Sequence, residues 1–171
     1  SELLLLLSLI NAQNIPRDLL DKYKGPLIVA NFIYHLNKYS LIMNTSLSPF
    51  NSMSSLSLHH STQDISFPYL VQQLALNKGN LALDAIANTL DDYMDEAIEQ
   101  EDFPKMRIMV AHLEKFLEHS ELLTDLSKGL LKSKLGSLYY FINDDRARKT
   151  LTESLKILRI QNLENLSFED K

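Results

Sequence analysis

The sequence predicts a mainly helical fold in two parts, and three observations support this prediction. Apolar residues recur at helical spacing in four successive stretches from residue 80 almost to the end of the chain. The first part instead combines short helical stretches with two short runs that resemble strands. The 171 residues are 45% hydrophobic, enough for one ordinary domain or two small ones. We therefore expect one domain over residues 1–77 and a second over residues 78–171.

Charge and composition limit the classes of molecule that this chain is expected to bind. The net charge is -5 at pH 7, and Lys and Arg are not clustered, which argues against non-specific nucleic-acid binding. The chain has no cysteine, which excludes disulfides, thiolate metal sites and a cysteine nucleophile. This composition is compatible with a reducing compartment, and we expect a cytoplasmic location.

The leucine-rich run over residues 2–10 resembles the apolar part of a signal peptide. It lacks a basic leader, and residues 11–14 do not form a small-residue cleavage site. The run is also too short to span a bilayer, so it predicts a buried helix and no membrane association. The chain starts without methionine, which fits a fragment of a longer protein, the interpretation we adopt, and leaves a processed native start as the alternative.

Two further helices are expected before residue 40. Asn14 is a capping-type residue, and Pro16 would lie in the first turn of the second helix. Gly25 ends that helix and Pro26 opens the third. The third helix has apolar residues at helical spacing, namely Val29, Phe32, Ile33 and Leu36.

Residues 40–43 and 54–59 predict two short strands. The segment between them, residues 45–53, is rich in Ser and Asn and contains Pro49, which suits a loop. Three helices followed by a loop-bridged hairpin predict a winged helix.

Four longer helices are expected after residue 80. One apolar face comprises Leu83, Ile86, Ala87, Leu90, Met94, Ala97 and Ile98, and the next comprises Met106, Met109, Val110, Leu113, Phe116 and Leu117. The third comprises Leu131, Leu135, Leu138, Tyr139 and Ile142, and the fourth Ala147, Leu151, Ser154, Leu155 and Leu158. Turns at Phe103-Pro104 and at residues 143–145 make these two successive helical hairpins, as in an α-solenoid.

The last hairpin resembles a tetratricopeptide repeat. Small residues at Gly136, Ala147 and Ser154 would let its two helices approach, while larger residues fill the space between them, namely Leu135, Tyr139 and Leu151. The hairpin over residues 81–119 shares the architecture without this signature.

The first part resembles the winged-helix domain of signal-transduction ATPases of the STAND class, particularly the NB-ARC type. The resemblance covers roughly residues 3–76 and rests on residues 4–20, 32–42 and 56–65. In that family an apolar residue and a histidine end a strand, Asp or Arg follows, and many microbial members have Gln in the next helix. Leu58, His59 and Gln63 match this pattern, whereas His60 departs from it.

The resemblance implies a regulatory function without catalysis. His59 would contact the phosphates of ADP bound to an upstream nucleotide-binding domain of the same chain, and the repeats would bind an unknown protein partner. ADP or ATP is thus implied for the parent protein, and no cofactor for this fragment. The sequence has no glycine-rich loop ending in Lys-Ser or Lys-Thr, so we expect no ATP hydrolysis by this chain alone and do not expect an enzyme.

The histidines have simpler interpretations too. A metal site formed by His59 and His60 is disfavoured, because adjacent strand residues point to opposite faces. A surface or hydrogen-bonding role for His59 stays open beside nucleotide sensing. His112 and His119 lie seven residues apart, which is not metal-ligand spacing, and we expect both to be solvated.

Other features leave further alternatives open. The acidic run over residues 91–102 lacks the spacing of a calcium loop and is expected to be a solvated helix face. Tyr140 and Phe141 are candidate protein-binding residues, whereas Tyr139 is expected in the core. A winged helix also raises DNA binding, but the third helix offers only His35 and Lys38 for this role. A free-standing helical protein-interaction module is the other alternative, and no residue constellation favours a small helical enzyme.

Overall fold

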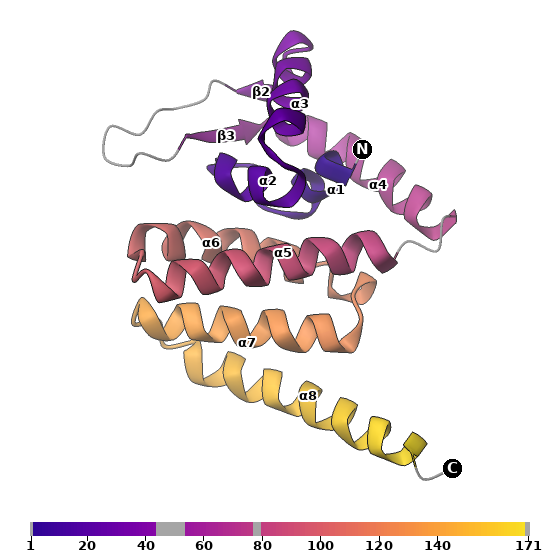
Figure 1. Ribbon diagram of the computed structural model, residues 1–171, viewed down its shortest axis with the longest axis vertical. Coiled ribbons are helices and arrows are strands. Elements are labelled where there is room, and N and C mark those ends of the chain that lie inside the picture. The colour runs from indigo at the N-terminus through magenta and orange to yellow at the C-terminus, as the bar shows by residue number, and fades with distance from the viewer. Residues whose placement is uncertain (1, 44–53, 77–79, 170–171) are drawn as a thin grey trace. The chain divides into compact units, whose positions relative to one another are not determined.

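Helices form most of the described chain, as predicted, and they fall into two units, Ser1–Ala82 and Leu83–Lys171 (Figure 1). The structure is a computed structural model that describes residues 2–43, 54–76 and 80–169. The predicted loop over residues 45–53 and the predicted boundary between residues 77 and 78 lie outside the described residues. In the described ranges, every helix falls short of the length and apolarity that a bilayer crossing requires.

The first unit has the helices and hairpin predicted for a winged helix. Its elements in order are α1 (Glu2–Leu9), β1 (Ile15–Pro16), α2 (Arg17–Lys24), α3 (Pro26–Lys38), β2 (Ile42–Met43), β3 (Ser55–Leu58) and α4 (His60–Leu76). The sheet is antiparallel with the order β1-β3-β2, so the last strand lies between the first two.

Helix α1 is the centre of this unit. Leucines occupy almost every position, so the helix has no polar face to turn toward water. All of Leu3, Leu5, Leu6, Leu7, Leu9 and Ile10 are at most 3% exposed. The leucine-rich run is therefore a buried helix, as expected.

Strand β3 shows the alternation that predicted it. Leu56 and Leu58 are buried, whereas Ser55 and Ser57 are half-buried, because successive strand residues face opposite sides. Leu56 pairs with Ile15 and Leu58 pairs with Ile42.

Strand β1 was not predicted. The prediction that Pro16 lies in the first turn of a helix is wrong: Pro16 belongs to β1, and α2 begins one residue later. Asn14 does not cap that helix; it adopts a positive φ of 55°, and its backbone N–H donates to Ser57 Oγ at 3.2 Å. Proline suits this edge strand, since it has no N–H to donate to a further neighbour.

The side chain of Gln63 joins α4 to the end of α1. Its Nε2 donates to the carbonyl oxygens of Leu7 at 2.6 Å and Ile10 at 2.8 Å. Carbonyls in the last turn of a helix have no partner within that helix. Because α1 ends inside the core, Gln63 supplies the hydrogen bonds that water would otherwise supply.

The second unit is a series of helices that follow one another in Figure 1. Its elements are α5 (Asn80–Glu99), α6 (Phe103–Leu117), the short 3-10 helix η1 (Ser120–Leu122), α7 (Asp125–Phe141) and α8 (Ala147–Glu169). The predicted inner faces of α5, α6 and α7 are buried nearly throughout. On α8 both Ser154 and Leu155 were expected on the inner face; Ser154 is buried and contacts α7, whereas Leu155 is 55% exposed.

Helices α7 and α8 approach closely at two glycines. A Cβ on Gly136 would lie 2.6 Å from Leu151 Cγ and 3.1 Å from the Leu151 backbone nitrogen. A Cβ on Gly129 would lie 2.7 Å from Leu158 Cδ2. Ser154 is 1% exposed, and its hydroxyl donates to the Gly129 carbonyl at 2.9 Å. Small residues therefore set the spacing of this hairpin, as expected for Gly136 and Ser154.

Three helices end at a residue other than glycine in the left-handed conformation. Ser40, Glu101 and Asn143 have φ of 53°, 52° and 57° and follow α3, α5 and α7. In each case the next N–H donates back across the last turn, to Leu36, Ala97 and Tyr139 respectively. This is the Schellman arrangement, in which glycine usually holds the left-handed position. The chain contains only four glycines, and none is used at these three ends.

We predict that Gln63→Leu destabilises the first unit. The substitution leaves the Leu7 and Ile10 carbonyls buried without their side-chain donor, which should lower the free energy of unfolding by about 2–4 kcal/mol. Native-state hydrogen exchange of the α1 amides would measure this loss. Gln72→Leu is the matched control on the exposed side of α4 and should change stability by less than about 0.5 kcal/mol. Equal effects of the two substitutions would contradict the prediction.

Candidate functional site

His59 and His60 lie at the junction of β3 and α4. The His59 N–H donates to the Leu41 carbonyl at 3.2 Å, and its own carbonyl accepts from the Thr62 N–H at 2.9 Å. The His59 backbone thus links the hairpin to the first turn of α4. Its side chain is half-buried, while that of His60 is exposed. Within the described residues no three His, Asp or Glu side chains are grouped to hold a metal ion.

Four large apolar or aromatic side chains of α3 and its C-cap are exposed, beside the exposed polar residues of the same helix, Asn31, His35, Asn37 and Lys38. Leu27 is 86% exposed, Ile28 59%, and Tyr34 and Tyr39 are each 63% exposed. Only Val29 and Leu36 of this helix are buried, although Phe32 and Ile33 were also expected to face the core and are half-buried. We call the side formed by Leu27, Ile28, Tyr34 and Tyr39 the α3 face.

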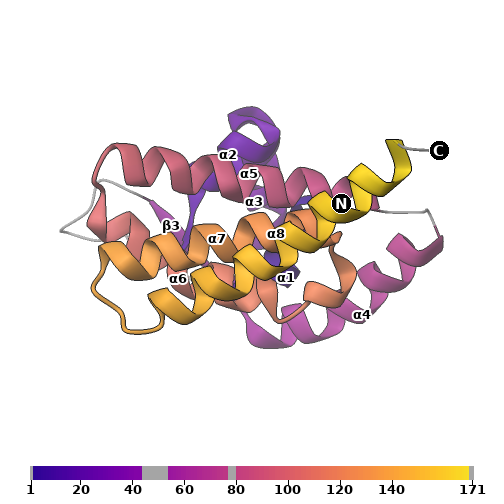
Figure 2. The same cartoon turned by 90° about the horizontal axis from the view of Figure 1, so that it is seen from below.

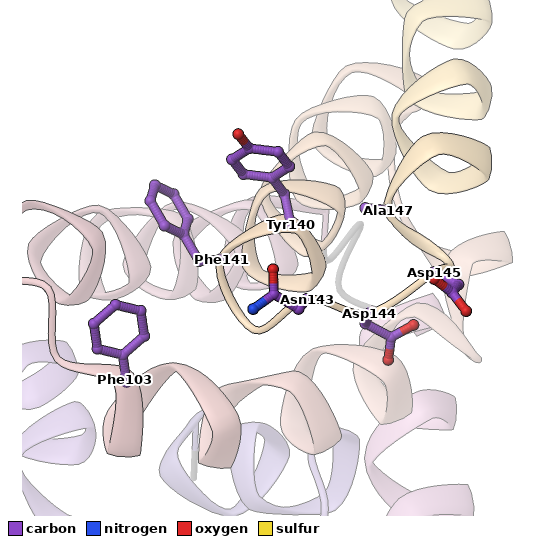
Figure 3. A pocket seen from close by; sticks show the side chains of 7 residues that line it. All are labelled: Phe103, Tyr140, Phe141, Asn143, Asp144, Asp145 and Ala147. Atoms are coloured by element: carbon purple, nitrogen blue, oxygen red, sulfur yellow. The ribbon is translucent and has the colours of Figure 1, made fainter.

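A pocket of about 450 Å³ lies at the turn between α7 and α8 (Figure 3). Seven residues line it: Phe103 from the start of α6, Tyr140 and Phe141 from the end of α7, Asn143, Asp144 and Asp145 from the turn, and Ala147 from α8. We call it the turn pocket. It brings together the two candidate protein-binding residues, Tyr140 and Phe141, while Tyr139 is buried as expected. The contributions of Phe103 and of the turn residues were not foreseen.

Backbone hydrogen bonds close the turn that lines the turn pocket. The Asp144 N–H donates to the Tyr139 carbonyl at 2.8 Å, and the Asn143 N–H donates to the Tyr140 carbonyl at 3.1 Å. The Asp144 carboxylate then accepts from the Arg146 N–H at 2.9 Å and so leads into α8. The turn is closed on both sides, which fixes the directions of the side chains around it.

Arg146, the last residue of the turn before α8, belongs to a network of four groups. Its guanidinium donates to Asp144 at 2.9 and 2.7 Å and to Glu114 of α6 at 2.6 Å. It also lies over the Tyr139 ring, 4.3 Å from the centroid, while the Tyr139 hydroxyl donates to Glu114. The network connects α6, α7 and the start of α8.

The charges of this network shift its pKa values. The hydrogen bonds from Arg146 lower the pKa of Asp144 to about 2. Burial, and then the hydrogen bond to Glu114, raise the pKa of Tyr139, so the phenol stays protonated. Hydrogen bonding to Asp144 raises the pKa of Arg146, which keeps its charge at all ordinary pH values.

Other sequence candidates are part of the packing of the second unit. His112 was expected to be solvated, but it is 1% exposed, because it lies beside Leu113 on the buried side of α6. His119 is half-buried, and burial lowers its pKa. In the acidic run, Asp91 and Asp95 both pair with Lys134 of α7, while Asp92, Glu96 and Glu99 are exposed.

Comparisons of this chain with protein-family models, with curated proteins and with solved structures found no match.

We predict that Arg146→Ala returns the pKa of Asp144 toward the ordinary value near 4. The folded-state pKa lies below the unfolded one, so the stabilising effect of this carboxylate is complete above about pH 4 and is lost as the pH falls toward 2. A carboxyl-carbon NMR titration of the wild type and the variant would measure the shift. Arg148→Ala, two residues along α8, is the control and should leave the titration unchanged. An unshifted wild-type Asp144 would contradict the prediction.

Proposed function

We propose that this chain is a non-catalytic regulatory and protein-interaction part of a larger STAND-type ATPase. Its winged helix would pack through the α3 face on an upstream nucleotide-binding domain. Its tetratricopeptide-like helical unit would bind a protein partner. The exposed apolar α3 face is the observation that carries the proposal.

An apolar α3 face favours a protein surface as its counterpart. Leu27, Ile28, Tyr34 and Tyr39 expose apolar area to water, and a docked protein domain would remove this area from water. Tyrosine is also a preferred anchor residue in protein interfaces. On the same helix Lys38 is the only lysine or arginine, and it lies over the Tyr39 ring at 5.7 Å. A helix that enters the major groove of DNA needs more cationic contacts than this.

His59 is proposed as the nucleotide-sensing residue of the closed state. Its backbone is held by Leu41 and Thr62, and its side chain is half-buried at the end of β3. A phosphate presented by a docked domain would gain a donor there. Binding of a partner to the helical unit would then bias the equilibrium between a closed ADP-bound and an open ATP-bound parent. A cytoplasmic location would accompany this function.

We predict that aspartate on the α3 face weakens docking to the nucleotide-binding domain. The first step is to find that domain by peptide sequencing of the native polypeptide, captured with an antibody to this chain. Leu27→Asp with Tyr34→Asp should then reduce the affinity for the separately produced domain at least tenfold, since two charges would be desolvated. Calorimetry would measure the change.

Ile65→Asp is the matched control for this experiment, because Ile65 is 77% exposed on α4 of the same unit. It should leave docking unchanged. A native polypeptide of the size of this chain, without a glycine-rich Lys-Ser or Lys-Thr loop, would overturn the ATPase proposal and leave a free-standing interaction module. Salt-sensitive retention on duplex DNA that is lost in Lys38→Ala would favour DNA binding instead.

We predict that the isolated chain neither turns over ATP nor binds ADP tightly, because it lacks a phosphate-binding loop. Calorimetry with ADP would measure this for the wild type and for His59→Ala, with His60→Ala as the control at the neighbouring exposed position. Micromolar ADP affinity that disappears only in His59→Ala would refute the claim that the site needs an upstream domain.

A further inference from the structure

We propose that the turn pocket binds an arginine side chain presented by a peptide segment of a protein partner. This inference rests on the proposed protein-binding function of the helical unit and names the chemistry that would recognise the partner.

Aromatic rings form one side of the turn pocket. Tyr140 is 69% exposed, Phe103 42% and Phe141 36%, and the rings of Tyr140 and Phe141 meet edge to face at 5.8 Å. Figure 3 shows these rings on one side of Asn143 and the carboxylates of Asp144 and Asp145 on the other. A volume of about 450 Å³ is within the range of ligand pockets and is large enough to take a long side chain.

The charge of the turn pocket favours a cation. None of its seven lining residues is basic. Asp144 is already paired with Arg146, but Asp145 is exposed and has no ion-pair partner among the described residues. The helical unit, Leu83–Lys171, also carries 18 Asp and Glu against 12 Lys and Arg, a balance that attracts basic segments over a longer range.

The same turn already holds one arginine by the chemistry that we propose. Arg146 stacks on Tyr139 and pairs with Asp144, five residues further along. Tyr140 and Asp145 have the same spacing in the sequence; both are exposed, both line the turn pocket, and neither contacts a cation of the described chain. Figure 3 shows the Tyr140 ring and the Asp145 carboxylate on opposite sides of Asn143, so the turn pocket offers an aromatic side and an acidic side to a side chain long enough to lie between them.

Arginine fits the turn pocket better than lysine. Its planar guanidinium stacks on aromatic faces and donates to a carboxylate with two N–H groups at once. A lysine ammonium is more strongly hydrated and has no planar face for the ring. A purely apolar side chain would contact the rings and leave the carboxylate unused.

The test is an NMR titration of the full chain with an acetylated and amidated pentapeptide that has arginine at its centre and glycine elsewhere. The reference probe has citrulline in place of arginine, which keeps the shape and removes the charge. We expect saturable shifts of the Asn143, Asp145 and Ala147 amides with the arginine peptide and at least fivefold weaker binding of the citrulline peptide.

Matched variants separate the two sides of the turn pocket. Tyr140→Leu removes the ring face and keeps an apolar residue, and Asp145→Asn removes the charge. Each should weaken binding at least threefold. Tyr69→Leu, at a tyrosine that is 62% exposed on α4, and Asp125→Asn, at the opposite end of α7, are the controls and should bind as the wild type does.

Two results would overturn the proposal. Equal binding of the two peptides would show an uncharged contact, and the absence of saturable shifts would show that the turn pocket does not take arginine. Neither result depends on the α3 face, which lies in the other unit. If the nucleotide-binding domain does not dock on the α3 face but the arginine peptide still binds, only the ATPase proposal is overturned.

Discussion

The first unit is organised by the need to bury a helix that has no polar side. Helix α1 is almost entirely leucine, so the other elements have to cover it all round, and its last carbonyls end in the core without water. Gln63 of α4 donates hydrogen bonds to these carbonyls. Strand β3, paired with β1 and β2, belongs to the same unit. Helix α3 contributes only Val29 and Leu36 as fully buried residues. Its other apolar side chains are half-buried or exposed.

The second unit follows a different principle, because its helices bury one face each and meet through small residues and charges. Gly136 and Gly129 bring α7 and α8 together at distances that a methyl group would disturb. At the end of this hairpin, Arg146 compensates two carboxylates and covers the ring of Tyr139. Close packing along the hairpin and charge pairing at its end together keep the aromatic residues of the turn in fixed positions.

Much of this fold was predictable because its elements have clear periods. The spacing of apolar residues predicted the helices of the second unit, and the alternation of Ser55 to Leu58 predicted β3. Strand β1 escaped prediction, since two residues are too few to show alternation and Pro16 is equally common at a helix start. The prediction that His112 is solvated was wrong, because His112 precedes the core residue Leu113 and helical spacing alone does not show whether such a neighbour faces the core or the solvent.

The candidate site was only partly predictable, for a reason that concerns distance along the chain. Tyr140 and Phe141 were recognisable as aromatic residues next to a turn. Phe103 lies about forty residues earlier, and its place in the turn pocket follows from the packing of α6 beside α7, which no local pattern encodes. Asp144 pairs with Arg146 whereas Asp145 is exposed, a difference that appears only once side chains are placed.

The left-handed residues at the helix ends place side chains, where glycine would have none, on the turns that follow the helices. Holding Ser40, Glu101 or Asn143 in this conformation costs roughly 1 kcal/mol compared with glycine, yet each position keeps a side chain at an exposed turn. Asn143 lines the turn pocket, and Glu101 lies two residues before Phe103, which lines it too. Substitutions at these positions can alter the polarity and size of the surface around the turn pocket while the helices stay in register. The turns of the second unit can therefore vary in sequence without a change of scaffold.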